Sequence, residues 1–373
     1  MHKNLLTLLF TLCVTASSLA QVSKGALKAY DRAINSYMAN DYEMVMYELD
    51  KAIKKSPNFA KPYFMKAQVM RDQKRFGFAI DHLKKGLAID DSEYYTGWFE
   101  LAELCWGEGL YEDGKIAIET FKESKGYAKF IEDSTLIHHY VRVKEGLDYS
   151  IQHMNDEGNF DSHKLGENIN TEYPEYYPSL SLNNKILIMT RRFRPVGYKV
   201  EQEDFYISKW SNRLNDWEKA QPIPGINTPA NEGAAAISGD GTTIVFTACQ
   251  APGFGYGKRE GKGSCDLFES TFDIEKGRWS IGTNLGAPNS GKWESQPTLS
   301  ADGNFLVFAR ARHTRGVGSD LFGSYRNSDG TWAKPFRLPG EINTPFEEES
   351  PFLHPDGKTL YFSSNGNPGM GGL

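Results

Sequence analysis

The sequence predicts a protein of two parts, an array of paired helices followed by a longer region of repeated four-stranded β-units. Two observations lead to this prediction. In the first third, small and bulky apolar residues return with helical spacing and a period of about 34 residues. In the remainder, short β-rich runs between glycine, asparagine and proline clusters return at a longer and nearly regular interval. At 373 residues, the chain is long enough for two or three domains.

The helical third consists of three units in the same phase. The first two begin at Ala26 and Ala60, and the third begins one residue late at Tyr95. Pro57 closes the first unit because a helix cannot continue through proline, whereas Asp91 stands at that position in the second. In the first helix, a bulky position holds Ala29, Tyr63 and Trp98, and a small position four residues later holds Ala33, Ala67 and Ala102. In the second helix, a small contact position holds Val45, Ala79 and Gly114, and the position four residues later holds Leu49, Leu83 and Ile118.

This pattern, most clearly Trp98-x-x-Leu101-Ala102, resembles the tetratricopeptide repeat over residues 24–125. One helical hairpin cannot bury its own apolar face, so neighbouring units stack and leave a concave surface. The resemblance implies that this surface binds peptides or proteins, and residues 126–160 are expected to form capping helices and a linker. The expected groove residues are Tyr30, Tyr37, Phe64, Arg71, Phe99 and Trp106, with the alternative that several of them pack between helices.

The β-rich region, residues 161–373, contains four segments that superpose on one another. Ser181, Ser238, Ser300 and His354 mark equivalent positions, at similar intervals along the chain. A tight turn follows each position, and its sequence is Asp-Gly in the last three segments and Asn-Asn in the first. Asparagine can replace Asp-Gly there because it also tolerates left-handed geometry. After an apolar second strand, a third strand opens with Asp204, Asp266 or Asp320, and a fourth contains Trp217, Trp279 or Trp332.

Four short strands in a unit of this length are typical of a propeller blade, and the motifs resemble the WD40-like repeats related to the TolB propeller. The sequence therefore predicts a tetratricopeptide α-solenoid followed by an incomplete WD40-like β-propeller. The fourth unit stops at Leu373, where the acidic residue of its third strand is due. An incomplete propeller would leave unpaired edge strands, which promote aggregation, so we expect the natural polypeptide to continue.

The order of these parts resembles that of envelope proteins of Bacteroidetes, which typically continue into a small carboxypeptidase-regulatory-like domain and an OmpA-like, peptidoglycan-binding domain. One branch of that group serves the type IX secretion and gliding machinery. The resemblance implies a periplasmic protein associated with the outer membrane, whose partners are envelope proteins or peptides. Peptidoglycan would be bound through a C-terminal domain outside this sequence, and no cofactor is expected.

Residues 1–20 predict export. Lys3 gives a positive start, residues 5–14 form an apolar run, and Ser18-Leu19-Ala20 has the form of a cleavage site, a combination typical of a secretory signal peptide. The run is too short to favour a membrane span, and no later stretch approaches the apolar length that a span needs. The formal net charge is -6, whereas a nucleic-acid-binding protein usually carries an excess of basic residues, so the composition does not favour nucleic-acid binding.

The usual catalytic and metal motifs do not occur: there is no Gly-x-Ser-x-Gly, His-Glu-x-x-His, Walker loop or Cys-x-x-Cys. We therefore expect a non-enzymatic scaffold for protein–protein interactions. Two alternatives stay open, a propeller hydrolase whose catalytic part lies outside this fragment and recognition of peptidoglycan or carbohydrate by aromatic loop residues. Those aromatic residues are Tyr198, Phe254, Tyr256 and Trp293.

One carboxylate recurs at a fixed place in every β-unit. Glu175, Glu232, Glu294 and Glu348 each lie three residues before the same first-strand position. This phase predicts a ring of carboxylates that holds a cation or a basic peptide. The alternative is that each glutamate bonds a neighbouring blade or loop, as repeat-phased residues often do.

Two of the cysteines predict a disulfide. Cys249 ends a second strand and Cys265 begins the adjacent third strand, on either side of a glycine-rich loop in an exported protein. Two free thiols are the alternative. Cys105 lies on an apolar helical face and is expected to be a buried small hydrophobe.

Overall fold

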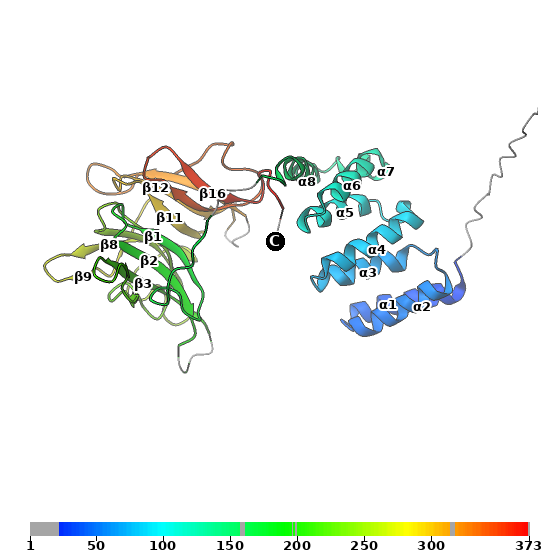
Figure 1. Ribbon diagram of the computed structural model, residues 1–373, viewed down its shortest axis with the longest axis horizontal. Helices are drawn as coiled ribbons and strands as arrows, with labels where there is room; N and C mark the ends of the chain where they lie inside the picture. The colour runs from blue at the N-terminus through cyan, green and yellow to red at the C-terminus, as the bar shows by residue number, and fades with distance from the viewer. Residues whose placement is uncertain (1–21, 157–160, 196, 198–199, 314–317, 372–373) are drawn as a thin grey trace, which may run out of the picture. The chain divides into compact units, whose positions relative to one another are not determined.

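The computed structural model describes residues 22–156, 161–195, 197, 200–313 and 318–371, and it divides into two compact units (Figure 1). The helical unit runs to Asp156 and also includes residues 368–371, whereas the β unit runs to Asn367. The predicted signal peptide, residues 1–20, lies outside the described residues. Each unit is treated below by itself.

The helical unit is built from neighbouring pairs of helices that stack on one another, as Figure 1 shows. The pairs α1/α2, α3/α4 and α5/α6 correspond to the three predicted units, and α8 packs on α5 and α6. Ser23 and Asp41 cap the first two helices, because their side chains accept the otherwise unpaired amides of Ala26 and Met44. The helices are α1 (Lys24–Met38), α2 (Tyr42–Lys55), α3 (Lys61–Asp72), α4 (Phe76–Ile89), α5 (Gly97–Gly107), α6 (Tyr111–Glu123), α7 (Lys125–Phe130) and α8 (Ser134–His153).

Small side chains set how closely these helices approach. A Cβ atom added to Gly114 would lie 2.6 Å from Leu147 Cδ2 and 3.2 Å from Cys105 Cβ, so glycine is what permits this contact between α5, α6 and α8. Cys105 is buried, as its apolar position predicted. The predicted small positions in the first helices are buried as well, namely Ala33, Ala67 and Ala102.

Among its described residues, the β unit contains three antiparallel sheets and a two-stranded fourth. Consecutive strands pair in each sheet, except that β5 pairs with β3 and β10 pairs with β8. The first strands β1, β6, β11 and β15 lie beside one another, and each sheet extends away from this centre, which is the arrangement of an incomplete propeller. Blade 1 contains β1 (Glu175–Leu180), β2 (Ile186–Phe193), β3 (Gln202–Ser211), β4 (Asp216–Trp217) and β5 (Gln221–Pro222). Blade 2 contains β6 (Asn231–Ile237), β7 (Thr243–Cys249), β8 (Cys265–Asp273), β9 (Arg278–Trp279) and β10 (Thr283–Asn284). Blade 3 contains β11 (Glu294–Leu299), β12 (Phe305–Ala311), β13 (Ser319–Tyr325) and β14 (Phe336–Arg337), and the fourth sheet contains β15 (Glu348–Leu353) and β16 (Leu360–Ser364).

The predicted turns between first and second strands have the expected geometry. In blade 2, Asp240 Oδ1 accepts from the Ser238 hydroxyl at 2.5 Å and from the Thr242 amide at 3.0 Å. Asn183 has the equivalent role in blade 1, and Asn184 has a φ of +55°, so asparagine does replace the Asp-Gly turn there.

An asparagine clamp closes each complete blade. Asn227 accepts from the Phe205 amide and donates to the Phe205 carbonyl, both at 2.9 Å. Asn289 and Asn343 bind the backbone of the equivalent third-strand residues, Leu267 and Leu321, in the same way. Two of these asparagines belong to the Ile-Asn-Thr-Pro loops of the sequence. The loops therefore recur because each one ties its amide side chain to the middle of its sheet.

Each first strand also carries a bulge that the sequence did not predict. Non-glycine residues at equivalent positions adopt positive φ values between 49° and 56°, and the strand register shifts there. Thr190 and Thr247 of the preceding blade accept the amides of two of these residues, so the bulge also joins neighbouring blades. The first strands enclose a cavity of about 540 Å³. The four bulge residues are Tyr177, Ala234, Gln296 and Ser350.

Candidate functional site

The six groove residues predicted in the helical unit are largely occupied by contacts inside the unit. The Tyr37 hydroxyl donates to Asp72 Oδ2 at 2.7 Å, and the Phe64 ring packs 5.2 Å from the Tyr94 ring. Tyr30 packs edge-on against Phe59 with ring centroids 5.3 Å apart. These three side chains are half-buried, so they mainly fix the packing of the helices and present only part of their surface.

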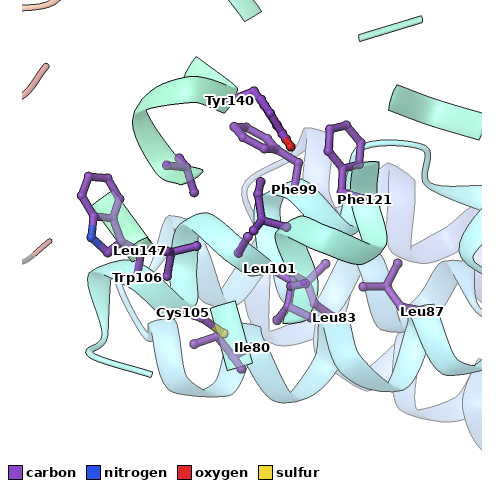
Figure 2. Close-up of a cluster of buried hydrophobic side chains, with 14 of the residues drawn as sticks. Ile80, Leu83, Leu87, Phe99, Leu101, Cys105, Trp106, Phe121, Tyr140 and Leu147 are labelled. Atoms are coloured by element: carbon purple, nitrogen blue, oxygen red, sulfur yellow. The ribbon is translucent and has the colours of Figure 1, made fainter. Parts of the chain in front are cut away.

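The remaining three predicted groove residues are also engaged. Phe99 is buried with Phe121 and Tyr140 in the cluster that Figure 2 shows. Arg71 forms an ion pair with Glu100. The predicted alternative, packing between helices, is therefore what the structure shows for Phe99.

Trp106 has partners within the helical unit. Its indole Nε1 donates to Ser150 Oγ at 3.2 Å and to the carbonyl of Gly369 at 3.2 Å. Ser150 Oγ donates to that carbonyl as well, and the Tyr111 hydroxyl donates to the carbonyl of Met370 at 2.8 Å. Residues 368–371, which the sequence assigned to the propeller region, therefore pack with the helical unit.

An exposed apolar stripe follows one face of α1. Leu27, Ile34 and Met38 are 43%, 39% and 80% exposed, and exposed Asp31 lies among them. Residues 27, 31, 34 and 38 share a face because they are three or four positions apart along the helix. We call Leu27, Ile34 and Met38 the α1 stripe. Sequence reasoning missed it, although the same spacing rule applied to residues outside the packing positions would have found it.

The four phased glutamates bond the loop that precedes each first strand. Thr171, Thr228 and Thr344 donate their hydroxyls to the glutamates four residues later, at 2.6, 2.6 and 2.5 Å, and Ser290 does the same for Glu294. The side chains of Glu232, Glu294 and Glu348 are fully buried. The expected ring that holds a cation or basic peptide is therefore replaced by the alternative arrangement, because each carboxylate is used by a loop of its own blade.

A guanidinium accompanies each of these carboxylates, but it comes from different places. In blades 1 and 3 it belongs to the second-strand residue paired with the glutamate, Arg191 or Arg310, and each Nε lies 2.8 Å from its carboxylate. The equivalent residues in the other two blades are Ala248 and Ser364, which carry no charge. Something else must therefore neutralise the buried carboxylates of those blades.

In blade 2 that cation is Arg259, from the loop between β7 and β8. Its Nη1 lies 2.8 Å from Glu232 Oε1, its Nε donates to the Ile281 carbonyl at 2.7 Å, and its Nη2 donates to the Ile226 carbonyl. Burial raises the pKa of Glu232, while hydrogen bonds from Thr228 and Arg259 oppose this shift.

In the fourth sheet the nearest guanidinium belongs to blade 3, where Arg312 Nη2 lies 3.6 Å from Glu348 Oε2. Arg312 also donates to the carbonyls of Thr344 and Pro345, at 3.0 and 2.7 Å. A neighbouring blade therefore supplies the charge that Ser364 lacks.

Cys249 and Cys265 are joined by a disulfide that closes the loop carrying Arg259. The two residues are direct partners in the pairing of β7 with β8. The disulfide therefore holds together the two ends of the loop, where β7 ends and β8 begins, and this loop carries the arginine that neutralises Glu232.

Removing this disulfide is expected to destabilise the β unit. With Cys249→Ser and Cys265→Ser together, the free energy of unfolding should fall by about 3 kcal/mol, the value that the chain-entropy model gives for a loop of this size. Urea denaturation with and without reductant measures the effect. Alkylation of both thiols in the unreduced, unfolded wild-type chain, detected by mass spectrometry, would refute the bridge.

The aromatic residues proposed for carbohydrate recognition differ in their accessibility. Tyr256 is buried, and its hydroxyl donates to the Gly263 carbonyl. Trp293 is half-buried, whereas Phe254 is 49% exposed. Tyr198 lies outside the described residues. Phe254 is thus the member of this set whose ring is most accessible.

The aspartates that open the third strands of blades 2 and 3 bond groups within the β unit. Asp266 is buried and accepts the amide of Gly263 at 3.1 Å, and Asp320 pairs with Arg312 and Arg337 at 2.9 and 2.8 Å. Although burial raises the pKa of Asp320, the hydrogen bonds from Arg337 and Arg312 more than offset that effect and leave it lowered. Within the described ranges, no group of three or more His, Cys, Asp or Glu side chains is placed to hold a metal ion.

Stacked helical hairpins followed by sheets arranged around a centre define a repeat protein that combines a tetratricopeptide array with a β-propeller-like region. No protein-family model matches the chain, and no curated protein does. Among solved structures, the helical part is similar to the first tetratricopeptide domain of Spaghetti (RPAP3), determined with an HSP90 peptide, at 14% identity and a TM-score of 0.29. That alignment covers 34% of this chain and 98% of the other.

The β part is similar to parts of larger proteins. Trypanosoma rangeli sialidase, solved with the inhibitor DANA, is 12% identical with a TM-score of 0.31, over 49% of this chain and 33% of the sialidase. A prolyl endopeptidase is 13% identical with a TM-score of 0.30, over 49% of this chain and 24% of the endopeptidase. At such identities the likeness concerns the fold alone.

Proposed function

We propose that this protein is a non-enzymatic scaffold that holds protein partners of the cell envelope. The observation that carries the proposal is the α1 stripe, because exposed apolar side chains gathered on one face are typical of sites that bind another protein. The stacked array provides this face on a rigid support. The residues that recur in the β unit serve its own packing, which also favours a structural role.

We further propose that the protein acts in the periplasm, in association with the outer membrane. The signal peptide predicted from residues 1–20 and the resemblance to envelope proteins of Bacteroidetes support this location. In the described part of the chain, no helix is long and apolar enough to cross a membrane. The resemblance suggests two assemblies for the scaffold, a peptidoglycan-anchored envelope complex and the type IX secretion and gliding machinery.

Partner capture from envelope extract tests the scaffold proposal. A tagged chain covering residues 22–373 should retain one or more proteins after crosslinking, and Leu27→Asp with Ile34→Asp should remove them, because charge on the α1 stripe opposes burial against a partner. Ile116 and Ile274 are exposed elsewhere, so Ile116→Asp with Ile274→Asp is the matched control. Equal capture by both double variants would show that the α1 stripe is not the binding surface.

A further inference from the structure

The loop between β7 and β8 differs from every other connection described in the β unit. A disulfide closes it, and two inward side chains, Tyr256 and Arg259, anchor it in the core of blade 2. Phe254 precedes these two anchoring residues and Lys258 lies between them, and the side chains of both are exposed. Arg259 gives the loop a role in the core of blade 2, but the exposed side chains of Phe254 and Lys258 take no part in neutralising Glu232, so this outward surface can serve a separate role.

This loop forms one wall of a cleft of about 760 Å³ that lies entirely in blade 2 and its connections. The other walls are residues 224–229 and residues 278–281, with buried Trp279 among them. Of the described residues that line the cleft, Lys258 and Arg278 are charged and none is acidic. The cleft is therefore cationic in a chain whose formal net charge is -6.

The neutral polar side chains of the cleft are already used by the fold. Asn227 clamps the Phe205 backbone, and the Thr228 hydroxyl donates to Glu232. Ser280 Oγ accepts the Thr271 amide at 3.1 Å. A neutral sugar is best held by side chains that accept from its hydroxyls, and the described lining offers no carboxylate and only amide and hydroxyl groups that already have partners, so the cleft is poorly equipped for a neutral saccharide. In contrast, no ion pair among the described residues involves Lys258 or Arg278.

We propose that this cleft binds an acidic peptide segment of a protein partner, with carboxylates on Lys258 and Arg278 and an apolar side chain against Phe254. The two cations supply charge-assisted hydrogen bonds, and the exposed ring supplies apolar contact area. Anchoring by the disulfide and by Arg259 holds the wall in place before the ligand arrives, which lowers the entropic cost of binding. This proposal depends on the proposed scaffold function in one respect only, namely that the ligand is part of a protein.

Calorimetric titration of residues 22–373 with a defined peptide tests this proposal. The probe is the capped hexapeptide Glu-Leu-Glu-Phe-Glu-Leu, and the same peptide with Gln in place of Glu is its neutral control. The acidic peptide should bind, and its affinity should fall about tenfold or more for Lys258→Ser with Arg278→Ser. Binding should weaken as salt is added, because both cations are exposed and screened.

Matched variants separate the cleft from overall charge. Lys219→Ser with Lys334→Ser removes two exposed cations outside the cleft and should leave the affinity within about twofold of wild type. Phe254→Ala should weaken binding several-fold. Equal binding of the acidic and neutral peptides, or equal losses in the two double variants, would overturn the proposal.

Two further results decide between ligand classes and between proposals. Tight binding of trigalacturonate without binding of the acidic peptide would overturn the peptide assignment in favour of an acidic saccharide. Failure of the peptide to bind, with partner capture still dependent on Leu27 and Ile34, would remove the cleft proposal and leave the scaffold function standing.

Discussion

Replacing Arg259 with methionine is expected to lower the free energy of unfolding of the β unit by about 3 to 5 kcal/mol, the range found when one partner of a buried ion pair is removed. The side chains of Arg259 and Glu232 are 1% and 0% exposed. Methionine fills much of the same volume but leaves the carboxylate without its counter-charge, with only Thr228 still donating to it, and removes the donors to the carbonyls of Ile226 and Ile281. Urea denaturation followed by tryptophan fluorescence measures the loss.

The matched control is Arg213→Met, because Arg213 is exposed. It should change the free energy of unfolding by no more than about 0.5 kcal/mol. If Arg259→Met were as mild as this control, the pair with Glu232 would not hold the blade together. Adding Glu232→Gln to Arg259→Met should recover part of the stability, because a neutral amide needs no cation.

The loss caused by Arg259→Met should also depend on pH in a defined direction. Burial already raises the pKa of Glu232, and removal of the nearby guanidinium raises it further. Between the ordinary carboxyl pKa of 4.5 and the raised value, the folded variant holds a proton that the unfolded chain has lost, so its stability falls as pH rises. The variant should therefore be closer to wild type at about pH 5 than at about pH 7. A deficit that grows as pH falls would contradict this account.

Replacing Phe121 with alanine is expected to destabilise the helical unit by about 3 to 5 kcal/mol, the usual cost of deleting a buried aromatic ring. Phe121 has no exposed surface. The centroid of its ring lies 5.1 Å from that of Phe130, 5.6 Å from that of Phe99 and 5.7 Å from that of Tyr127. Figure 2 shows Phe121 in the buried cluster with Phe99 and Tyr140. Alanine removes all of these contacts at once, because they are made by one ring, and it leaves a cavity in their place.

Circular dichroism at the helix band, recorded during urea denaturation, measures this effect on the helical unit. Phe78→Ala is the control, since Phe78 is 53% exposed and its ring contacts Arg75 at the surface. The control should cost no more than about 1 kcal/mol. A similar cost for both phenylalanines would mean that the aromatic cluster is not the core of the array.

Much of the fold could be predicted because its repeats follow the order of the chain. The period of the helical units identified the contacts at Ala102 and Gly114, since a close helix approach needs a small residue wherever it recurs. The pairing of Cys249 with Cys265 followed from their places at the ends of adjacent strands. Such features depend on residues within one unit, so spacing along the chain is enough to reveal them.

The candidate site was harder to predict because it depends on which side chains remain exposed. Phe99 and Trp106 belong to residue types common in binding surfaces, yet both are buried here by helices that follow later in the chain. The role of Arg259 was missed because its loop interrupts the repeat phase. A comparison of the residues at one fixed interval after the phased glutamates would have shown that two blades lack a cation. Those residues are Arg191, Ala248, Arg310 and Ser364.

Sequence alone was enough to establish the paired helices, the four-stranded units and the turns between them, because side-chain size and turn chemistry act between residues close in the chain. Only the tertiary structure decided which guanidinium neutralises each buried glutamate and which apolar or cationic side chains remain exposed to a partner. These outcomes depend on distances between residues far apart in the chain, such as Glu232 and Arg259, and packing sets those distances.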